Sequence, residues 1–324
     1  MKMHEWERDG VSAMNVLKRL AYGPLSGVFS LAYRVVSTGE YVYFSIRWRL
    51  EGAKRPTEQE AELVRENVTF IYKSFERQKL AKRLYRNIQR YYPGVKVIVA
   101  DDSRTPLDLH DKHIEVIQLP FNSGLSFGLN RALEKVNTPY VIRMDDDQLL
   151  TPHTRFHDQL RFLQTHPMVD LVGVLQFSTP RCERPAEAAK EFYNQPMNGA
   201  ALPLKIPHMS CIDGRVVVGK GSNVFITHTD KLKMIGYDDH VRMIDHHDFF
   251  YRSAGRLVSV IDPQAFVFHN HNRFNAHYRR FRSDVDGDRR YIAQRNYFEM
   301  MKYRAELRKQ HEENITPDSG RDKQ

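Results

Sequence analysis

The chain has 324 residues, and the 41% that are hydrophobic suffice for the core of one large α/β domain or two smaller ones. Its 49 lysines and arginines exceed its 40 acidic residues, and the resulting formal charge of +9 favours anionic partners such as nucleotides, phosphorylated lipids or an acidic membrane face. Two cysteines, Cys182 and Cys211, are too few for a disulfide scaffold and suit a reducing compartment, although one bridge could still form.

Residues 1–60 are predicted to form an N-terminal extension. The opening MKMHEWERDG is too charged for a secretory signal, and the chain holds no apolar run of about 18 residues, so a cytoplasmic location without a spanning helix is expected. Residues 15–36 are apolar, flanked by basic residues and broken at Gly23 and Pro24. This pattern leaves two interpretations: two small helices packed on the main domain, or peripheral contact of residues 13–36 with the inner face of a membrane.

Residues 61–275 are predicted to be a single α/β domain. Thr57 and Glu60 have the spacing of a capping box, which marks a helix start. Beyond it, apolar strands alternate with helical patterns, which predicts a mostly parallel sheet flanked by helices. Strands are expected at 68–75, 95–103, 114–120, 140–147, 170–177 and 257–272, and helices at 78–92, 125–136 and 156–167. Residues 276–324 are predicted to hold a basic loop, a C-terminal helix and a disordered tail.

Two acid clusters end predicted strands, Asp101-Asp102 and Asp145-Asp146-Asp147. One cluster alone could cap a helix, but two at the carboxyl ends of neighbouring strands favour a divalent cation, Mg²⁺ or Mn²⁺. In the run FVFHNHN, His269 and His271 alternate along a strand and so point to the same side, where either could add an imidazole ligand. The aspartates of these clusters, together with His269 or His271, are predicted to hold this ion.

The stretch MIDHHDFFYR carries Asp245 and Asp248 at what looks like a helix start. These acids could simply interact with the helix dipole. The functional interpretation makes Asp248 a general base that deprotonates a hydroxyl.

Taken in order, ADDS, SGLSFGLN, DDD and HHDFF resemble motifs of the inverting, nucleotide-sugar-dependent glycosyltransferases of the GT-A (Rossmann-like) fold. Residues 66–272 are most similar to the β-1,4-N-acetylgalactosaminyltransferase family, and then to the bacterial family 2 transferases that build polysaccharides. The resemblance implies a UDP-sugar donor, with GalNAc or GlcNAc as the sugar, and a hydroxyl of a glycan or lipid-linked acceptor. A cell-surface polysaccharide such as a capsule is the implied product.

The same resemblance implies roles for individual residues. Lys73 would lie near the nucleotide base, and Asp248 would be the catalytic base. Asp145 and Asp147 would form the DxD motif, with Asp145 facing the ribose and the metal and Asp147 ligating the metal, and His269 or His271 would complete the metal site, so the predicted metal ligands are Asp145, Asp147, His269 and His271. The residues implied in donor binding are Ser74, Phe75, Arg77, Asp101, Asp102, Asn130, Asp145 and Asp146. One departure stands out, because Leu129 occupies the place of an arginine that the family carries before Asn130. Arg131 follows one residue later and would point about 100° away on a helix.

Two other functions use the same acids: a metal-dependent hydrolase of phosphoesters or diphosphates, and a nucleotide-sugar binding protein without catalysis. Variable loops at 178–222 are expected to form the acceptor site. The basic stretch 273–290 is either a solvated surface or a flap over the diphosphate. Charge alone would allow nucleic acid as a partner, but no nucleic-acid-binding module accompanies it, so none is expected.

Overall fold

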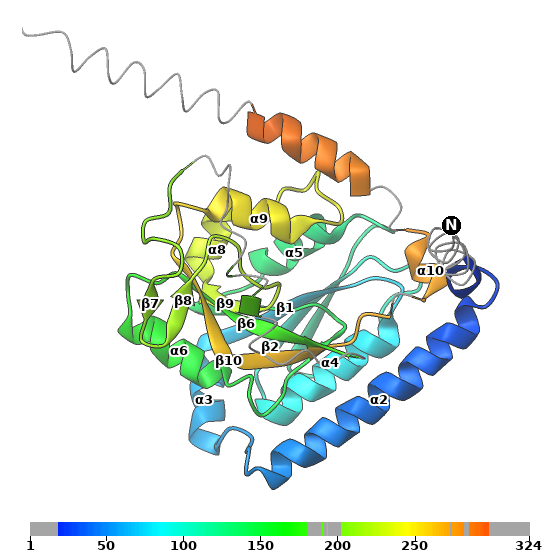
Figure 1. The fold of residues 1–324 in the computed structure, drawn as a ribbon, viewed down its shortest axis with the longest axis horizontal. Helices are drawn as coiled ribbons and strands as arrows, with labels where there is room; N and C mark the ends of the chain where they lie inside the picture. Colours follow the sequence, from blue (N-terminus) through cyan, green and yellow to red (C-terminus); the bar gives the residue numbers. More distant parts are fainter. Residues whose placement is uncertain are drawn as a thin grey trace, which may run out of the picture.

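The computed structural model describes residues 19–179, 189–190, 193, 202–272, 274–281 and 285–297. One central sheet has helices on both faces (Figure 1). The strands are β1 Val68–Ser74, β2 Lys96–Asp101, β3 Ile114–Gln118, β4 Tyr140–Arg143, β5 Gln148–Leu149, β6 Leu171–Ser178, β7 Cys211–Ile212, β8 Arg215–Val217, β9 Phe225–His228 and β10 Ser259–His269. The helices are α2 Ser26–Leu50, α3 Glu58–Asn67, α4 Gln78–Tyr91, α5 Leu125–Glu134, α6 Phe156–Thr165, α8 Thr229–Ile235, α9 Asp245–Ser253 and α10 Ala276–Arg279.

The strand order in the sheet is β3-β2-β1-β4-β9-β6-β10-β8-β7, and β5 pairs with the end of β10. Strands β3, β2, β1 and β4 are parallel, and so are β6 and β10. Strand β9 is antiparallel to both β4 and β6, so β6 and β10 run in the same direction as β4. The predicted α/β fold, with a mostly parallel sheet flanked by helices, is confirmed.

Both faces of the sheet are buried, which explains the unbroken apolar runs of its strands. Successive side chains of a strand alternate between faces. Phe70 and Tyr72 of β1 therefore pack in a core that includes residues of α4 and α6, whereas Ile71 packs in a second core with residues of α5 and α9. This double burial fixes the strand ends, from which the polar loops of the candidate site emerge.

Helix α3 begins at the predicted capping box. The Thr57 side chain accepts a hydrogen bond from the Glu60 amide, and the Glu60 carboxylate accepts one from the Thr57 amide at 2.8 Å. Because both groups satisfy amides that a helix start leaves without partners, the start is well defined.

The N-terminal region differs from the prediction of two small helices. A turn at Gly23 and Pro24 does interrupt the helix that includes residues 19–22, but the second piece, α2, continues for 25 residues to Leu50. Its inner face is held by Trp48, whose ring lies 5.2 Å from that of Phe266 and 5.1 Å from that of Phe268. These contacts with β10 explain why the helix persists beyond the apolar segment seen in the sequence. Among the described residues, no helix is long and apolar enough to cross a membrane.

A further helix covers residues 285–297 and lies above α9 (Figure 1). The predicted continuation of this helix and the predicted disordered tail lie outside the described residues, as do residues 1–18 and Cys182. Cys211 is a free, exposed thiol. The division into residues 1–60, 61–275 and 276–324 stays a prediction.

Candidate active site

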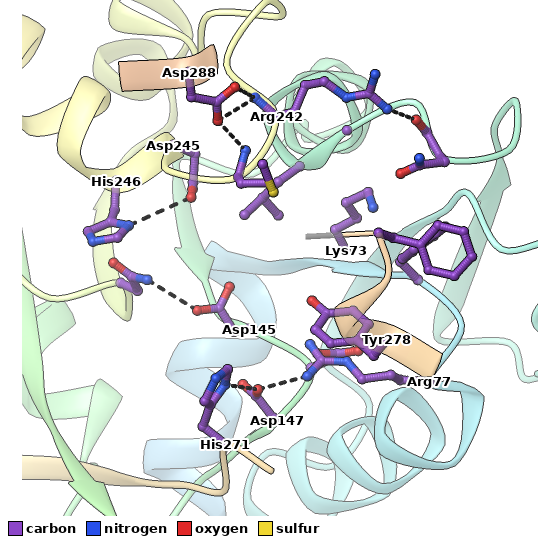
Figure 2. Close-up of a pocket in the computed structure, with 18 of the residues that line it drawn as sticks. Lys73, Arg77, Asp145, Asp147, Arg242, Asp245, His246, His271, Tyr278 and Asp288 are labelled. Atoms are coloured by element: carbon purple, nitrogen blue, oxygen red, sulfur yellow. Dashed lines mark hydrogen bonds and ion pairs between the residues drawn. The ribbon is translucent and has the colours of Figure 1, made fainter. Parts of the chain in front are cut away.

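A cavity of about 460 Å³ opens at the carboxyl ends of β1 and β4 (Figure 2). Parallel α/β sheets collect ligands at this edge. The cavity is lined by acids, basic side chains, histidines and aromatic rings: Lys73, Phe75, Arg77, Asn122, Gly124, Leu125, Asp145, Asp146, Asp147, Asn223, Arg242, Met243, Asp245, His246, His269, His271, Tyr278, Arg280, Phe281 and Asp288.

Three of the four predicted metal ligands lie together. One ligand atom each of Asp147, His269 and His271 lies within 4.8 Å of the others. His269 Nε2 is 3.6 Å from Asp147 Oδ1, and His271 Nδ1 is 3.5 Å from Asp147 Oδ2. The structure brings both imidazoles, not one, to this carboxylate: His269 ends β10, and His271 lies two residues beyond the strand. Asp145 lines the same cavity but is not part of this group among the described residues.

The group suits a divalent cation. Asp147 Oδ1 is buried and has no hydrogen-bond partner, so it is available to a ligand. Burial lowers the pKa of His269, and the negative charge of Asp147 opposes this shift only in part. The lowered pKa favours the neutral imidazole, which is the form that binds a metal. One carboxylate with two imidazoles is a ligand set accepted by Mn²⁺ and other transition metals.

Arg77 holds the acid cluster together. Its Nη1 lies 2.9 Å from Asp147 Oδ2, and its Nη2 pairs with Asp146. Burial raises the pKa of Asp146 against the pull of Arg77, whereas Arg77 and the two histidines outweigh burial and lower the pKa of Asp147 well below its usual range. Asp147 is therefore the acid of this pair that stays ionised and can bind a cation.

Asp145 is held by a buried arginine beneath the cavity. Arg143 Nη2 lies 2.9 Å from Asp145 Oδ1 and 2.9 Å from Asp245 Oδ2, and Arg143 is 1% exposed. Asn223 Nδ2 donates to the other Asp145 oxygen at 3.4 Å. Arg143 thereby joins the end of β4 to the start of α9 and keeps Asp145 at the cavity wall, away from the metal-binding group.

One wall of the cavity is aromatic. The Phe75 ring lies 5.1 Å from Phe281 and 6.4 Å from Tyr278, and the Arg77 guanidinium stacks 4.1 Å from the centre of the Tyr278 ring. Tyr278 and Phe281 belong to the basic stretch that was predicted to be either a solvated surface or a flap. In the structure its described residues, 274–281 and 285–290, contribute Phe281, Asp288 and other side chains to the cavity.

Asp101 and Asp102 follow β2 as predicted, but both are fully buried and neither lines the cavity. Asp101 accepts hydrogen bonds from the Ser103 hydroxyl at 2.6 Å and the Leu107 amide at 2.7 Å. Asp102 pairs at 2.6 Å with Lys73, which does line the cavity. The acids thus organise the loop and position Lys73. Ser74, also predicted in donor binding, is buried and outside the lining as well.

Helix α5 explains two parts of the motif SGLSFGLN. A Cβ at Gly128 would lie 3.0 Å from Lys73 Cδ, so glycine leaves room for the lysine side chain. Leu129 is fully buried in the core, which accounts for an apolar residue at that position. Asn130 bonds to Tyr237 and Asp239 and does not line the cavity, and Arg131 pairs with Glu134 on the helix surface.

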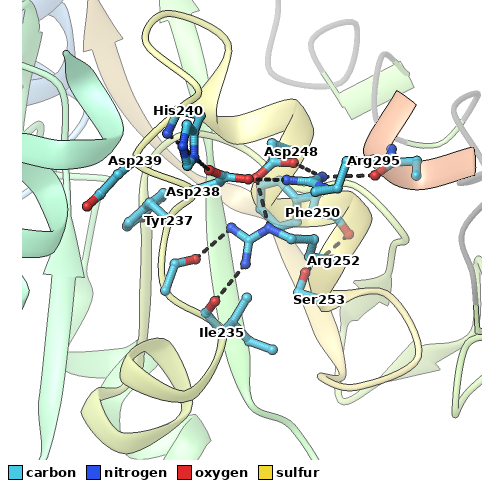
Figure 3. A network of polar contacts seen from close by, with 12 residues as sticks. Ile235, Tyr237, Asp238, Asp239, His240, Asp248, Phe250, Arg252, Ser253 and Arg295 are labelled. Carbon is cyan, nitrogen blue, oxygen red and sulfur yellow. Dashed lines mark hydrogen bonds and ion pairs between the residues drawn. The ribbon is translucent and has the colours of Figure 1, made fainter. Parts of the chain in front are cut away.

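The predicted catalytic base, Asp248, does not line the cavity but belongs to the network of polar contacts in Figure 3. It is 1% exposed, and its two oxygens are taken by Arg252 Nε at 2.8 Å and by Arg295. Arg295 comes from the helix at 285–297 and also binds Asp238 at 2.6 Å. Both oxygens of Asp248 are thus occupied by arginines, and this network fixes the helix at 285–297 against α9.

The first turn of α9 instead presents Asp245 and His246 to the cavity (Figure 2). His246 Nδ1 lies 3.8 Å from Asp245 Oδ1, a buried oxygen without a hydrogen-bond partner. Burial opposes ionisation of Asp245, but Arg143 and His246 outweigh it and lower its pKa. A carboxylate beside an imidazole orients the ring, and histidine accepts protons near neutral pH.

Sequence reasoning missed the contribution of the C-terminal helix. Asp288 accepts hydrogen bonds from the amides of Arg242, Met243 and Ile244, at distances between 2.7 and 3.3 Å. These contacts shape the loop before α9 and place Arg242 at the cavity. Nothing in the local sequence signals a contact between residues 46 positions apart.

Residues 69–217 match the family model "Glycosyl transferase family 2", so this part of the chain is similar to the glycosyltransferase domains of that family. The chain is 31% identical over 209 residues to Beta-1,4 N-acetylgalactosaminyltransferase 2 of Mus musculus, covering 64% of this chain and 40% of that protein. It is 30% identical over 200 residues to Beta-1,4 N-acetylgalactosaminyltransferase 1 of Homo sapiens, covering 59% and 36%. The chain thus spans less than half the length of these relatives. The resemblance predicted from the sequence is confirmed.

Two solved structures are similar at 16% sequence identity and a TM-score of 0.48. TarS 1-349 of S. aureus matches over 63% of this chain and 60% of its own. The mannosyltransferase PcManGT of Pyrobaculum calidifontis, solved in complex with GDP-Man and Mn2+, matches over 87% and 85%.

Proposed function

We propose that this chain, whose residues 69–217 match the glycosyl transferase family 2 model, moves a sugar from a UDP-sugar to an acceptor hydroxyl with inversion at the anomeric carbon. The observation that carries the proposal is a single cavity in which the Asp147–His269–His271 group, an aromatic wall and basic side chains meet. These are the three features that a metal-bound nucleoside diphosphate requires.

The nucleotide base is proposed to stack against the wall of Phe75, Tyr278 and Phe281, since aromatic rings offer flat apolar contacts to a base. Arg242 and Arg280, which line the cavity, would neutralise part of the diphosphate charge. Arg77 would keep Asp147 oriented toward the metal-binding group.

Asp147, His269 and His271 are the residues that would hold Mn²⁺ or Mg²⁺. When bound, the ion would supply Lewis-acid stabilisation of the charge on the departing diphosphate. The protein's part is to fix these ligands at the end of β10 and of β4, next to the cavity.

His246 is proposed as the general base in place of Asp248. It lines the cavity, and Asp245 lies beside its Nδ1, so Nε2 could accept the proton of the acceptor hydroxyl. As that proton moves to His246, the hydroxyl oxygen bonds to the anomeric carbon from one face and the bond to the diphosphate oxygen breaks on the other. This single displacement inverts the configuration and needs no covalent sugar–enzyme intermediate.

The similarity to the β-1,4-N-acetylgalactosaminyltransferases supports GalNAc or GlcNAc as the transferred sugar. The acceptor is proposed to be a glycan or lipid-linked sugar in the synthesis of a cell-surface polysaccharide. Residues 61–275 would form the catalytic domain, with the described part of 178–222 next to the acceptor.

The test is a screen of UDP-sugars with Mn²⁺, with and without candidate glycan acceptors, in which free UDP is measured. Release that depends on the acceptor supports transfer. Acceptor-independent release would indicate a diphosphate hydrolase, and binding without release would indicate a non-catalytic protein; either result would refute the proposal. Loss of all release in the His246→Gln variant, with retained UDP binding, would support the assigned base.

A further inference from the structure

A second cavity of about 410 Å³ lies between α2 and α4, which run beside each other in Figure 1. Its lining combines arginines, amides and hydroxyls with three apolar or aromatic side chains: Ser37, Thr38, Tyr41, Arg83, Arg86, Asn87, Arg90, Leu149, Thr179, Phe268 and Asn270. None of these residues belongs to the candidate active site, although Asn270 directly follows the metal-binding His269. We refer to this cavity as the α2–α4 groove.

The groove carries an unbalanced positive charge. Arg83, Arg86 and Arg90 follow one another at spacings of three and four residues, so they share one face of α4. Helix α4 contains no acidic residue, and no described carboxylate forms an ion pair with any of these three arginines. The negative charges of Asp147 and Asp146 raise the pKa of Arg83, but neither carboxylate is within ion-pair distance of it.

Arg83 has buried N–H groups that are available to bind an anionic ligand. Its Nε and Nη2 are buried and have no hydrogen-bond partner. Burial lowers its pKa, and the nearby acids only partly oppose this effect. Leaving buried guanidinium N–H groups without acceptors is unfavourable, and an anion in the groove would supply the missing acceptors.

The outer face of α2, on the side of the helix that points away from the groove, is apolar. Helical spacing places its exposed apolar side chains on one side: Leu25, Val28, Leu31, Val35, Val36, Val42, Tyr43, Ile46 and Leu50. Val28 and Val35 are each 65% exposed, and Leu50 is 83% exposed. This face, which we call the outer α2 face, extends over about 35 Å, and Arg49 of the last turn lies at its edge, in the same direction as Leu31.

Basic side chains border the outer α2 face. Arg34 is exposed along one margin, and Arg47 and Arg49 lie in the last turn of the helix. Arg49 and Arg55 lie close to Tyr91 of α4, as does Arg90. Burial raises the pKa of Tyr91, and the positive charges of these three arginines partly oppose that rise. An apolar helix face bordered by cations is typical of a helix that lies in the surface of a membrane with acidic headgroups.

We propose that the outer α2 face inserts into the surface of an acidic lipid membrane while the α2–α4 groove binds the phosphate of a lipid headgroup. Charge complementarity favours an acidic lipid. The arginines of the groove would bind its phosphate, and the outer α2 face would contact the acyl chains of the membrane. Tyr41, Leu149 and Phe268 give the groove an apolar floor that a free phosphate does not need but a lipid does. The inference is independent of the proposed sugar transfer.

The first test is flotation of the full chain with vesicles, in the absence of sugar nucleotides. Phosphatidylcholine vesicles with and without phosphatidic acid are compared. We expect binding only to the acidic vesicles, and the Arg83→Gln/Arg86→Gln variant should bind them roughly 30-fold more weakly. The matched control, Arg161→Gln/Arg256→Gln, removes the same charge from exposed positions elsewhere and should bind like the wild type. Equal weakening in both variants, or in neither, would overturn the groove assignment.

The second test separates the lipid from other occupants. Val35→Glu/Ile46→Glu changes only exposed positions, so the protein should fold as before, which its melting temperature would verify, and should lose vesicle binding. A wild-type dimer that this variant abolishes, without any vesicle binding, would overturn the membrane assignment in favour of a second copy. If inorganic pyrophosphate raises the melting temperature through Arg83 while vesicles do not bind, the ligand is a soluble phosphate and the lipid proposal fails.

Discussion

The assignment of His246 as the general base leads to the sharpest prediction about activity. His246→Gln keeps a polar side chain of similar size but removes the group that accepts a proton. The residue lies in the first turn of α9, where it is partly exposed at the cavity and next to Asp245, so the substitution should leave the fold intact.

The expected loss follows from what a positioned base contributes. General base catalysis by a side chain is typically worth 10²–10⁴-fold in rate, or about 3–5 kcal/mol of barrier. Because the Asp147 group and the aromatic wall are untouched, UDP affinity and the Michaelis constant for the donor should change little. The loss should therefore appear in kcat, with a weaker dependence of kcat on pH.

The chain offers a matched control in the next residue. His247 is a histidine of the same helix turn, but it does not line the cavity. UDP release would be measured at saturating donor and acceptor for the wild type, His246→Gln and His247→Gln, with UDP affinity determined by calorimetry. Near-normal turnover in His246→Gln would refute the reasoning, as would an equal loss in His247→Gln.

Three further predictions concern stability. Gly128→Ala should destabilise the fold by about 1–3 kcal/mol in urea denaturation, because the added Cβ would crowd the Lys73 side chain; an unchanged midpoint would contradict this. Arg143→Met should cost about 3–5 kcal/mol, since Asp245 would be left buried without its cation, and a neutral effect would speak against the buried ion pair. Burial lowers the pKa of His157, although the charges of Asp158 and Glu60 partly oppose the shift. On acidification His157 is therefore protonated more readily in the unfolded chain than in the native state. The free energy of unfolding should therefore fall as the pH drops below about 6.5, and less so in His157→Gln.

Much of the fold follows from local sequence patterns. The apolar strands, the acids at their ends and the capping box at Thr57 and Glu60 all appear in the structure where the pattern predicted them. In the structure His269 ends β10 and His271 lies two residues beyond it, and both are next to Asp147; their role as metal ligands stays a prediction. These features depend on neighbours in the chain, which the sequence displays directly.

Which acid of α9 lines the cavity could not be predicted in this way. Asp245 and Asp248 are three residues apart and so lie on similar sides of the helix, and helical spacing alone does not decide which of them reaches the cavity. With α9 beginning at Asp245, that acid and His246 line the cavity, whereas Asp248 turns toward Arg252 and Arg295. Arg295 lies 47 residues beyond Asp248, and no local signal predicts such a contact.

The length of α2 was missed for a similar reason. The sequence favoured short helices because Gly23 and Pro24 interrupt the apolar segment, and that interruption is real. The continuation to Leu50 depends on Trp48 packing against β10, more than 200 residues later in the chain. Tertiary packing of this kind overrides local propensity.

The central claim is that one cavity binds a sugar nucleotide through a divalent ion. Calorimetric titration of Mn²⁺ in the presence of UDP tests this claim most directly. We predict saturable binding to the wild type and an affinity lower by about tenfold or more in His271→Ala, which loses one ligand of the Asp147 group. His240→Ala, an exposed histidine outside the cavity, is the control and should bind like the wild type. Identical Mn²⁺ affinity in wild type and His271→Ala, or UDP binding that needs no divalent ion, would contradict the account.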